Sequence, residues 1–356
     1  MRILLATGHP YIPQIAGGAQ SSMNELAHSL MERGHSVAVA AGLSGRGWLA
    51  LRSRVLFKLS GKPVAVDGFL GYDVFRAWFV WDAIEEISRR FKPSVVFVQS
   101  GFPARIASRC RSLGVPVAIY LRNVEDEDLG GDISALRDVQ YVANSEFTAR
   151  RFKEKFGVPS TVVYPLLQRS RYETTPECRN VTFVNPHPSK GSALALDIAE
   201  HCPDIPFVFV EGWTLDREIR QALLERIAKL GNVTLVPRTQ RMVDVYRNAR
   251  IVIVPSKWEE AFGRVAAEAH FSGIPVVANR IGGLPEAVGP GGLLIDPAAP
   301  VSEWVRAVRR LWADDAYWKE MSIAARHYGR RDALNPDHQV REIVAVLSAT
   351  VAKSRF

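Results

Sequence analysis

The sequence predicts an α/β protein with two doubly wound domains, each built on a mainly parallel sheet covered by helices. Short apolar strand patterns alternate with helical stretches in both halves of the chain, which is the order expected of βαβ units. The length of 356 residues exceeds what one hydrophobic core usually holds, and the hydrophobic fraction of 47% can fill two cores. We therefore expect two domains of ordinary size.

The first domain is predicted over residues 1–168. Helical patterns at 21–33 and 104–113 connect short apolar runs that have the length and composition of buried strands. Strands are expected at 2–6, 36–40, 94–98, 115–120 and 139–143.

The second domain is predicted over residues 169–335. It begins with a polar, irregular stretch at 169–180 that is typical of a linker. The same alternation of strand and helix patterns then resumes. Strands are expected at 181–185, 206–210, 233–237, 251–254 and 275–278.

The segment that follows the strand at 251–254 carries the strongest indication of function. The strand is a β-branched apolar run closed by Pro255, and a helix is expected at 265–270. Ligands of open α/β sheets bind beyond the carboxyl ends of the strands, where the next helix offers free N–H groups to an anion. Glu260 and Glu268 lie at this place in the sequence.

These two glutamates suit a long, hydroxyl-rich ligand. On helical geometry Glu260 and Glu268 lie about 12 Å apart along the axis. The paired carboxylates of glycoside hydrolases lie about 5–10 Å apart, so a hydrolytic pair is not expected. An ionised carboxylate accepts hydrogen bonds from two neighbouring hydroxyls, and a nucleotide sugar carries such hydroxyls at both ends.

The residues Glu260 to Glu268, EAFGRVAAE, resemble the E-x7-E motif of family 4 retaining glycosyltransferases, which have the GT-B fold. The stretches GIPVV at 273–277 and GGLPE at 282–286 resemble that family's next two signatures, in the same order. The resemblance implies two Rossmann-like domains facing across a cleft, the first on the acceptor side and the second binding the nucleotide-sugar donor. It also implies a C-terminal helix over 336–356 that crosses back to the first domain.

The resemblance assigns donor contacts in the second domain. Glu260 is expected to contact the donor sugar and Glu268 the ribose, with Phe262, Gly263 and Arg264 near the diphosphate. The nucleotide base is expected near Arg238 and Thr239, on position alone.

Lys190 is expected to neutralise the diphosphate, and with Glu260 it forms our predicted catalytic set. It precedes Gly191 between a strand and a helix, where the family also has a lysine-glycine pair. The leaving diphosphate gains negative charge in the transition state, so a fixed ammonium stabilises that state more than the ground state. The family usually adds an arginine five or six residues earlier, whereas this chain has Val184 and Asn185, and Arg264 is a candidate to compensate.

Gly17 and Gly18 open the first helix and resemble the family's first glycine-rich loop, which lets backbone N–H groups approach a phosphate. A tight turn is the alternative. The G-x-G-x-x-G pattern of nicotinamide dehydrogenases is absent here.

The acceptor side is expected to include Arg122, Asn123 and His9. Many relatives carry a histidine after the strand at 115–120, where this chain has Arg122, so a catalytic histidine is not carried over. For Arg122 and Asn123 a plain loop surface is the alternative. Because no persuasive pair of catalytic carboxylates is found, the phosphate oxygens are the expected acceptors of the acceptor proton.

No metal ion or other cofactor is expected besides the nucleotide-sugar co-substrate. Asp126, Glu127 and Asp128 could suggest a D-x-D metal site, but we interpret them as a solvated acidic loop. The three cysteines lack metal-ligand spacing and indicate a reducing compartment.

The net charge of +8 makes an anionic partner plausible, but no nucleic-acid-binding motif accompanies it, so nucleic acid is not expected.

Residues 46–59 mix cations with Trp48 and Phe57 in a helical pattern, which suits an anionic membrane surface or a lipid-linked acceptor. A core helix whose arginines reach outward is the interpretation that we prefer. No apolar run is long enough to cross a bilayer, so we expect a cytoplasmic protein, with peripheral binding to the inner face of the membrane as an option.

We expect a retaining, metal-independent glycosyltransferase that moves a sugar from a nucleoside-diphosphate donor, with UDP as the carrier. The acceptor is expected to be a hydroxyl of a sugar, a lipid-linked molecule or a small molecule, in polysaccharide, glycolipid or glycoconjugate synthesis. Two alternatives stay open. One is a GT-B-like nucleotide-sugar epimerase, and the other is a non-catalytic protein that binds nucleotide sugars or anionic lipids.

Overall fold

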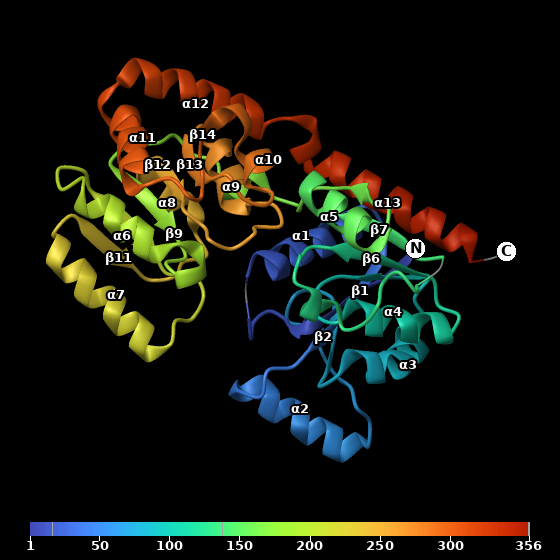
Figure 1. Ribbon diagram of the computed structural model, residues 1–356. Helices are drawn as coiled ribbons and strands as arrows, with labels where there is room; N and C mark the ends of the chain where they lie inside the picture. Colours follow the sequence, from blue (N-terminus) through green and yellow to red (C-terminus); the bar gives the residue numbers. More distant parts are fainter. Residues whose placement is uncertain (16, 137, 355–356) are drawn as a thin grey trace. The chain divides into compact units, whose positions relative to one another are not determined.

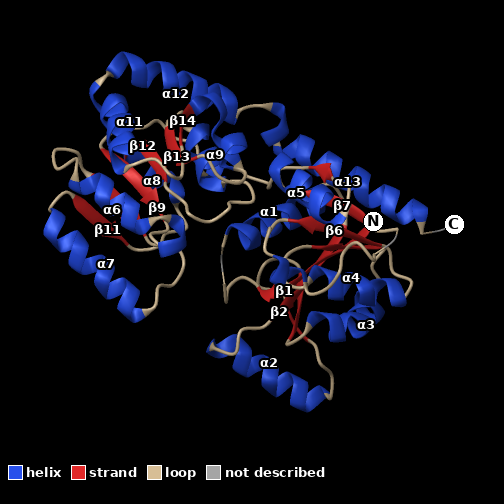
Figure 2. Cartoon of the chain, in the orientation of Figure 1, coloured by secondary structure: helices blue, strands red, loops and turns tan. Residues whose placement is uncertain are grey.

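The structure is a computed structural model that describes residues 1–15, 17–136 and 138–354. The chain forms two compact units. Unit 1 comprises Met1–Leu166 together with Pro336–Phe356, and unit 2 comprises Leu167–Asn335. In both units helices flank a sheet, so the predicted doubly wound α/β class is confirmed for each half (Figure 1, Figure 2).

The described residues of unit 1 contain an eight-stranded sheet in the order β3-β4-β2-β1-β5-β6-β7-β8. Strand β3 runs antiparallel to β4, and the other described pairs are parallel. The strands are β1 (Arg2–Pro10), β2 (Ser36–Gly42), β3 (Ala65–Asp67), β4 (Asp73–Ala77), β5 (Val95–Val98), β6 (Val117–Leu121), β7 (Gln140–Ala143) and β8 (Thr161–Val162). The helices are α1 (Gly18–Glu32), α2 (Gly47–Ser60), α3 (Val80–Phe91), α4 (Pro103–Ser112), the 3-10 turn η1 (Asp126–Leu129), α5 (Glu146–Phe156) and α13 (Pro336–Lys353).

Two buried clusters cover the two faces of this sheet. Side chains alternate along β1, so that Leu4 joins the cluster under α3, α4 and α5, while Leu5 joins the cluster under α1 and α13. On α13, Val340, Ile343 and Leu347 recur at helical spacing and are buried against this second face. The C-terminal helix therefore completes the core of unit 1.

The described residues of unit 2 contain a six-stranded parallel sheet in the order β11-β10-β9-β12-β13-β14. Its strands are β9 (Asn180–Val184), β10 (Phe207–Val210), β11 (Val233–Val236), β12 (Ala249–Val254), β13 (Val276–Asn279) and β14 (Gly292–Ile295). Its helices are α6 (Ser192–Glu200), α7 (Arg217–Leu230), α8 (Met242–Asn248), α9 (Arg264–Phe271), α10 (Leu284–Val288), α11 (Val301–Ala313) and α12 (Asp315–Gly329), with short turns η2 (Arg169–Arg171), η3 (Pro188–Lys190), η4 (Gly289–Gly291) and η5 (Asp332–Leu334). Phe183, Ile253 and Trp304 of α11 meet in its core.

Each sheet contains one point where the strand order reverses. In unit 1 the chain leaves β1 toward β2 on one side and β5 toward β6 on the other, and in unit 2 the same reversal lies between β9 and β12. Ligands of doubly wound sheets bind outside the carboxyl ends of the strands at this switch point. The switch points therefore mark where functional side chains are expected.

Helix α2 lies on the surface, which corrects our preference for a core helix over 46–59. It packs beside β3, the edge strand, so that only a narrow strip of the helix is covered. Its large apolar side chains that face solvent are Trp48, Leu51, Val55 and Leu59. Among the described residues, no helix combines the length and the apolar composition that crossing a membrane requires.

Candidate functional site

An ion pair between Lys190 and Glu260 lies at the switch point of unit 2. The Lys190 Nζ and Glu260 Oε1 atoms are 2.7 Å apart, and the two side chains are 14% and 19% exposed. Lys190 ends η3 directly after β9, and Glu260 lies in the loop after β12. Because β9 and β12 are neighbours in the sheet, the fold brings together both residues of the predicted catalytic set.

Close backbone contacts fix the loops that carry this pair. A Cβ atom on Gly191 would lie 1.9 Å from the carbonyl oxygen of Pro255, and Gly191 has a φ of 85° that favours glycine. On the other side, the Gly283 N–H donates to the Glu260 carbonyl oxygen at 2.7 Å, and a Cβ on Gly282 would lie 2.5 Å from that same oxygen. The glycine pair at 282–283 therefore holds the Glu260 loop in place.

Trp213 is a third member of this site that the sequence did not predict. Its ring centroid lies 4.8 Å from Lys190 Nζ, and the His187 ring meets it edge-on at 5.4 Å. The backbone N–H of Trp213 donates a hydrogen bond to Asn185 Oδ1 at 3.0 Å. Asn185 has a φ of 65°, a conformation that asparagine tolerates better than most residues. Where the resemblance suggested an arginine, this chain thus uses Asn185 to hold the Trp213 loop.

Glu268 is held in a buried polar network on α9. Its Oε1 accepts a hydrogen bond from Arg264 Nε at 3.2 Å, and its Oε2 accepts one from the Tyr246 hydroxyl at 2.9 Å. Burial, with the nearby Glu268 carboxylate, raises the pKa of Tyr246 well above its ordinary range, so this hydroxyl remains a donor. Arg264 Nη2 also donates to the Tyr172 hydroxyl at 3.0 Å. Arg264 is thereby directed at Glu268 and Tyr172.

The other predicted donor residues occupy varied positions. The Phe262 ring is buried in the core, so a ligand contact would fall to its backbone. Gly263 has a φ of 109° and is the N-cap of α9. Arg238 and Thr239 follow β11, which β10 separates from β9 in the sheet. The Thr239 Oγ1 atom accepts a hydrogen bond from the Arg241 N–H at 3.0 Å.

In unit 1, Arg122 joins the glycine-rich turn to the switch point. Gly17 caps α1 and Gly18 is its first residue, whereas Ala16 of this loop lies outside the described residues. Arg122 is buried, and its Nη1 donates to Gln99 Oε1 at 2.7 Å and to the Ala19 carbonyl oxygen at 3.4 Å. The loop-surface alternative for Arg122 is therefore wrong.

His9 and Asn123 converge on Asp128 at the end of β1. His9 Nε2 lies 2.8 Å from Asp128 Oδ1, and Asn123 Nδ2 donates to Asp128 Oδ2 at 2.8 Å. The hydrogen bond with Asp128 raises the pKa of His9 above its ordinary value, against the opposing effect of burial. The prediction of a solvated acidic loop is thus wrong for Asp128. Asp126 of the same turn forms an ion pair with Lys155.

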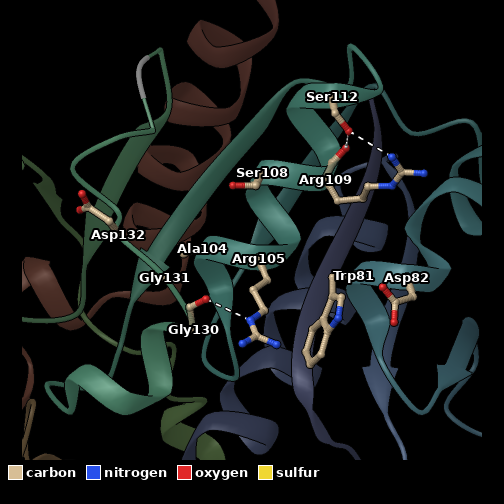
Figure 3. Close-up of a pocket in the computed structure, with 10 residues that line it drawn as sticks. All are labelled: Trp81, Asp82, Ala104, Arg105, Ser108, Arg109, Ser112, Gly130, Gly131 and Asp132. Carbon is tan, nitrogen blue, oxygen red and sulfur yellow. Dashed lines mark hydrogen bonds between the residues drawn. The ribbon is translucent and has the colours of Figure 1, made fainter.

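A surface pocket of about 430 Å³ lies elsewhere in unit 1, along α3 and α4 (Figure 3). Trp81, Arg105 and Asp132 are among its lining residues, and Arg105 Nε donates to the Gly130 carbonyl oxygen at 3.1 Å. The pocket contains none of the predicted site residues and flanks the helices rather than the carboxyl ends of the strands. The pocket is therefore a weaker indication of a ligand-binding site than the switch points are. Across the described part of the chain, no group of three or more His, Cys, Asp or Glu residues is arranged to hold a metal ion.

Comparisons with known proteins identify the family and the fold. Residues 16–168 match the family model described as Glycosyltransferase Family 4, and residues 192–314 match the model described as Glycosyl transferases group 1. The chain belongs to family 4 of the glycosyltransferases. The family that the segment after Glu260 predicted is thereby confirmed.

Curated relatives are similar to parts of this chain. A D-inositol 3-phosphate glycosyltransferase of Corynebacterium urealyticum is 36% identical over 160 residues, which are 42% of this chain and 37% of that protein. The chain thus spans about two fifths or less of the length of the curated relatives that it matches first.

Solved structures are similar over almost the whole chain. HepE of Anabaena in complex with UDP-glucose has a TM-score of 0.77 at 18% identity, covering 98% of this chain and 100% of that chain. The UDP-GlcNAc 2-epimerase of Neisseria meningitidis has a TM-score of 0.60 at 15% identity, with 98% and 100% covered. Likeness at such identities shows the fold, and the predicted GT-B fold is confirmed.

Proposed function

We propose that this family 4 member transfers a sugar from a nucleoside-diphosphate donor to a hydroxyl acceptor, with retention of the anomeric configuration and without a metal ion. The observation that carries the proposal is the Lys190–Glu260 ion pair at the switch point of unit 2. Each partner has the chemistry that one end of such a donor requires, and each is held by a loop that glycines fix in place.

The pair provides complementary charges for the two parts of the donor. The Lys190 ammonium attracts the diphosphate and stabilises the charge that develops on it as the sugar departs. The Glu260 carboxylate accepts hydrogen bonds from sugar hydroxyls. In the free protein the two groups neutralise each other, so a donor that contacts both replaces one interaction by two. The partly exposed Trp213 ring supplies an apolar surface beside them.

UDP is the carrier that we propose, as in the UDP-glucose complex of HepE. The acceptor is a hydroxyl of a sugar, a lipid-linked molecule or a small molecule, in polysaccharide, glycolipid or glycoconjugate synthesis. Glu268 is our ribose contact, because it is the second glutamate of the E-x7-E segment and its hydrogen bonds with Arg264 and Tyr246 orient its carboxylate.

Thermal unfolding with added nucleotides tests the donor assignment. UDP at a hundred times its dissociation constant is expected to add about 2.7 kcal/mol to the free energy of unfolding, because it binds the native state alone. GDP, dTDP, ADP and NAD serve as controls measured at the same concentration. If NAD raises the unfolding temperature while none of the nucleoside diphosphates does, the result would contradict the proposed transferase function.

An epimerase remains the alternative that the fold itself permits, because the Neisseria meningitidis epimerase shares it. Product analysis separates the two. An epimerase isomerises the nucleotide sugar without an acceptor, whereas a transferase releases the nucleoside diphosphate as the acceptor gains a sugar. Donor binding without turnover on a broad acceptor panel would favour the non-catalytic alternative.

Peripheral membrane binding through α2 is a further part of the proposal. Leu51 and Leu59 are 64% and 80% exposed, and the exposed Trp48 ring contacts Phe69 at a centroid distance of 5.4 Å. The helix and its N-cap also carry four cations, which are Arg46, Arg52, Arg54 and Lys58. An apolar face beside basic residues suits an interface that contains anionic lipids.

Replacing both leucines by Leu51→Glu and Leu59→Glu is expected to weaken binding to phosphatidylglycerol vesicles at least about tenfold, because two apolar contacts are lost and two negative charges are added. Vesicle flotation measures the fraction of protein that is bound to the vesicles. Ile323→Glu on α12 is the matched control, because Ile323 is a similarly exposed apolar residue of unit 2. Equal flotation of wild type and the double variant would contradict membrane binding through α2.

A further inference from the structure

Three loops of unit 2 bring Trp213, Lys190 and Glu260 together. The loops follow β10, β9 and β12, which are neighbours in that order in the sheet. Lys190 is the middle residue, because its Nζ atom lies 4.8 Å from the centroid of the Trp213 ring and 2.7 Å from Glu260 Oε1. The ammonium group therefore has two partners of different chemistry, an aromatic ring and a carboxylate.

Backbone contacts fix the position of Trp213. Its backbone N–H donates to Asn185 Oδ1 at 3.0 Å, and the Asn185 N–H donates to the Val210 carbonyl oxygen at 2.8 Å. A Cβ atom on Gly212 would lie 2.7 Å from the Asn185 Cβ atom, so the two loops approach more closely than a side chain at this position would permit. Asn185 also has a φ of 65°, in the left-handed region. The chain thus uses a glycine and a strained asparagine to place Trp213 beside Lys190.

The Trp213 ring is oriented but remains accessible. The His187 ring meets it edge-on at a centroid distance of 5.4 Å. His187 is fixed in turn, because its Nδ1 accepts a hydrogen bond from the Ser189 N–H at 3.2 Å. The Trp213 side chain is 45% exposed, so it faces solvent next to Lys190 and its replacement leaves the core of unit 2 intact.

An aromatic ring and a carboxylate hold an ammonium group in different ways. The Glu260 carboxylate neutralises the charge of Lys190, whereas the face of the Trp213 ring attracts the cation through its quadrupole and leaves the positive charge in place. In the proposed function Glu260 accepts hydrogen bonds from the donor sugar, so Lys190 loses this partner when the donor binds. The Trp213 ring is the partner that stays.

We propose that Trp213 is the positioning residue of Lys190, and that it keeps the ammonium at the diphosphate after Glu260 has turned to the donor sugar. The proposal rests on the transferase function proposed above. Lysine carries its charge on a flexible four-carbon stem, and ordering that stem during the reaction costs conformational entropy. The Trp213 ring holds the stem in advance, which removes this cost from the transition state. Trp213 thus acts through Lys190, and its contribution depends on that residue.

Steady-state kinetics with a nucleotide sugar and a fixed acceptor tests this dependence. Trp213→Leu is expected to lower kcat about tenfold with little change in the KM of the donor, and Trp213→Phe, which keeps an aromatic face, is expected to stay within about threefold of the wild type. Trp213→Leu combined with Lys190→Ala is expected to be no slower than Lys190→Ala alone. Trp318→Leu is the matched control with an unchanged kcat, because Trp318 packs against Arg250 at the amino end of β12, opposite the site.

Nuclear magnetic resonance measures the contact without turnover. Protons near the face of an aromatic ring resonate upfield, so the Hε protons of Lys190 are expected upfield of those of exposed lysines, and Lys190→Arg assigns them. Trp213→Leu is expected to remove this upfield shift, and Trp213→Phe is expected to keep it. Saturating UDP is expected to leave the shift in place, because the ring still holds the ammonium when the diphosphate is bound.

The outcomes separate this inference from the function on which it rests. If Trp213→Leu lowers kcat by the same factor with and without Lys190, the ring acts on the donor directly and the positioning role is wrong. If Trp213→Leu keeps the wild-type kcat, or if UDP abolishes the upfield shift, Trp213 does not hold Lys190 during transfer. If the wild type transfers no sugar and binds no nucleoside diphosphate, the proposed function itself fails, while the upfield shift still decides whether the ring and the ammonium meet.

Discussion

Lys190→Ala is expected to lower kcat/KM by about tenfold to a hundredfold, because one charge-assisted contact with the departing diphosphate is lost. The loss should fall mainly on kcat, since the negative charge of the diphosphate grows in the transition state. Steady-state kinetics with a nucleotide sugar and a fixed acceptor measures it. Wild-type turnover in this variant would remove Lys190 from the catalytic set.

A charge-matched control accompanies this experiment. Lys257 is exposed and lies in the loop that precedes Glu260, and its backbone N–H donates to the Ser189 carbonyl oxygen, beside Lys190. Lys257→Ala removes the same charge close to the site without removing the ion pair. A loss of activity equal to that of Lys190→Ala would mean that general electrostatic attraction, rather than a specific contact, explains the effect.

Asp67→Ala is expected to lower the free energy of unfolding of unit 1 by about 3–5 kcal/mol, the usual consequence of leaving one charge of a buried pair uncompensated. Arg76 Nε and Asp67 Oδ2 lie 2.9 Å apart, and the two side chains are 1% and 0% exposed. The Arg76 guanidinium also donates to the carbonyl oxygens of Tyr11 and Ile12. This ion pair therefore holds the segment that leads from β1 to α1. Urea denaturation followed by hydrogen exchange in β1 and β4 measures the loss.

Two controls define the origin of that loss. Asp67→Ala combined with Arg76→Met removes both charges, and it should recover part of the stability because no charge is then buried alone. Glu85→Ala breaks the exposed pair with Arg109, and it should change stability by less than about 1 kcal/mol. A loss within 1 kcal/mol for Asp67→Ala would contradict the assignment of a strongly coupled buried pair.

Most of the strands that sequence reasoning predicted are buried on both faces, and the exception is β11, a partly exposed edge strand. The expected strands at 251–254 and 275–278 correspond to β12 and β13, because continuous β-branched runs have few other uses in an α/β protein. The prediction missed β4, whose Arg76 interrupts the apolar pattern. Only the ion pair with Asp67, on the adjacent β3, makes that arginine compatible with burial. The edge strands β8 and β14 were missed because they are short and partly covered.

The two halves of the candidate site differ in how far sequence could predict them. Lys190 and Glu260 follow predicted strands, so their residue types and positions already indicated a donor site. Trp213 follows β10, and an aromatic residue just beyond a predicted strand was the one available signal. For Asp128 no local signal existed, since an acidic turn in the sequence is the same whether water or a histidine faces it.

The sequence by itself determined the fold class, the family and the loops of the proposed donor site, because burial periodicity and glycine-dependent turns are local properties of the chain. Only the tertiary structure decided which side chains meet. Lys190 pairs with Glu260 because β9 lies beside β12, and Asp128 faces His9 because η1 reaches the end of β1. The charge and the proton affinity of a group depend on its partners in space, and those partners follow from strand order rather than from neighbouring residues in the chain.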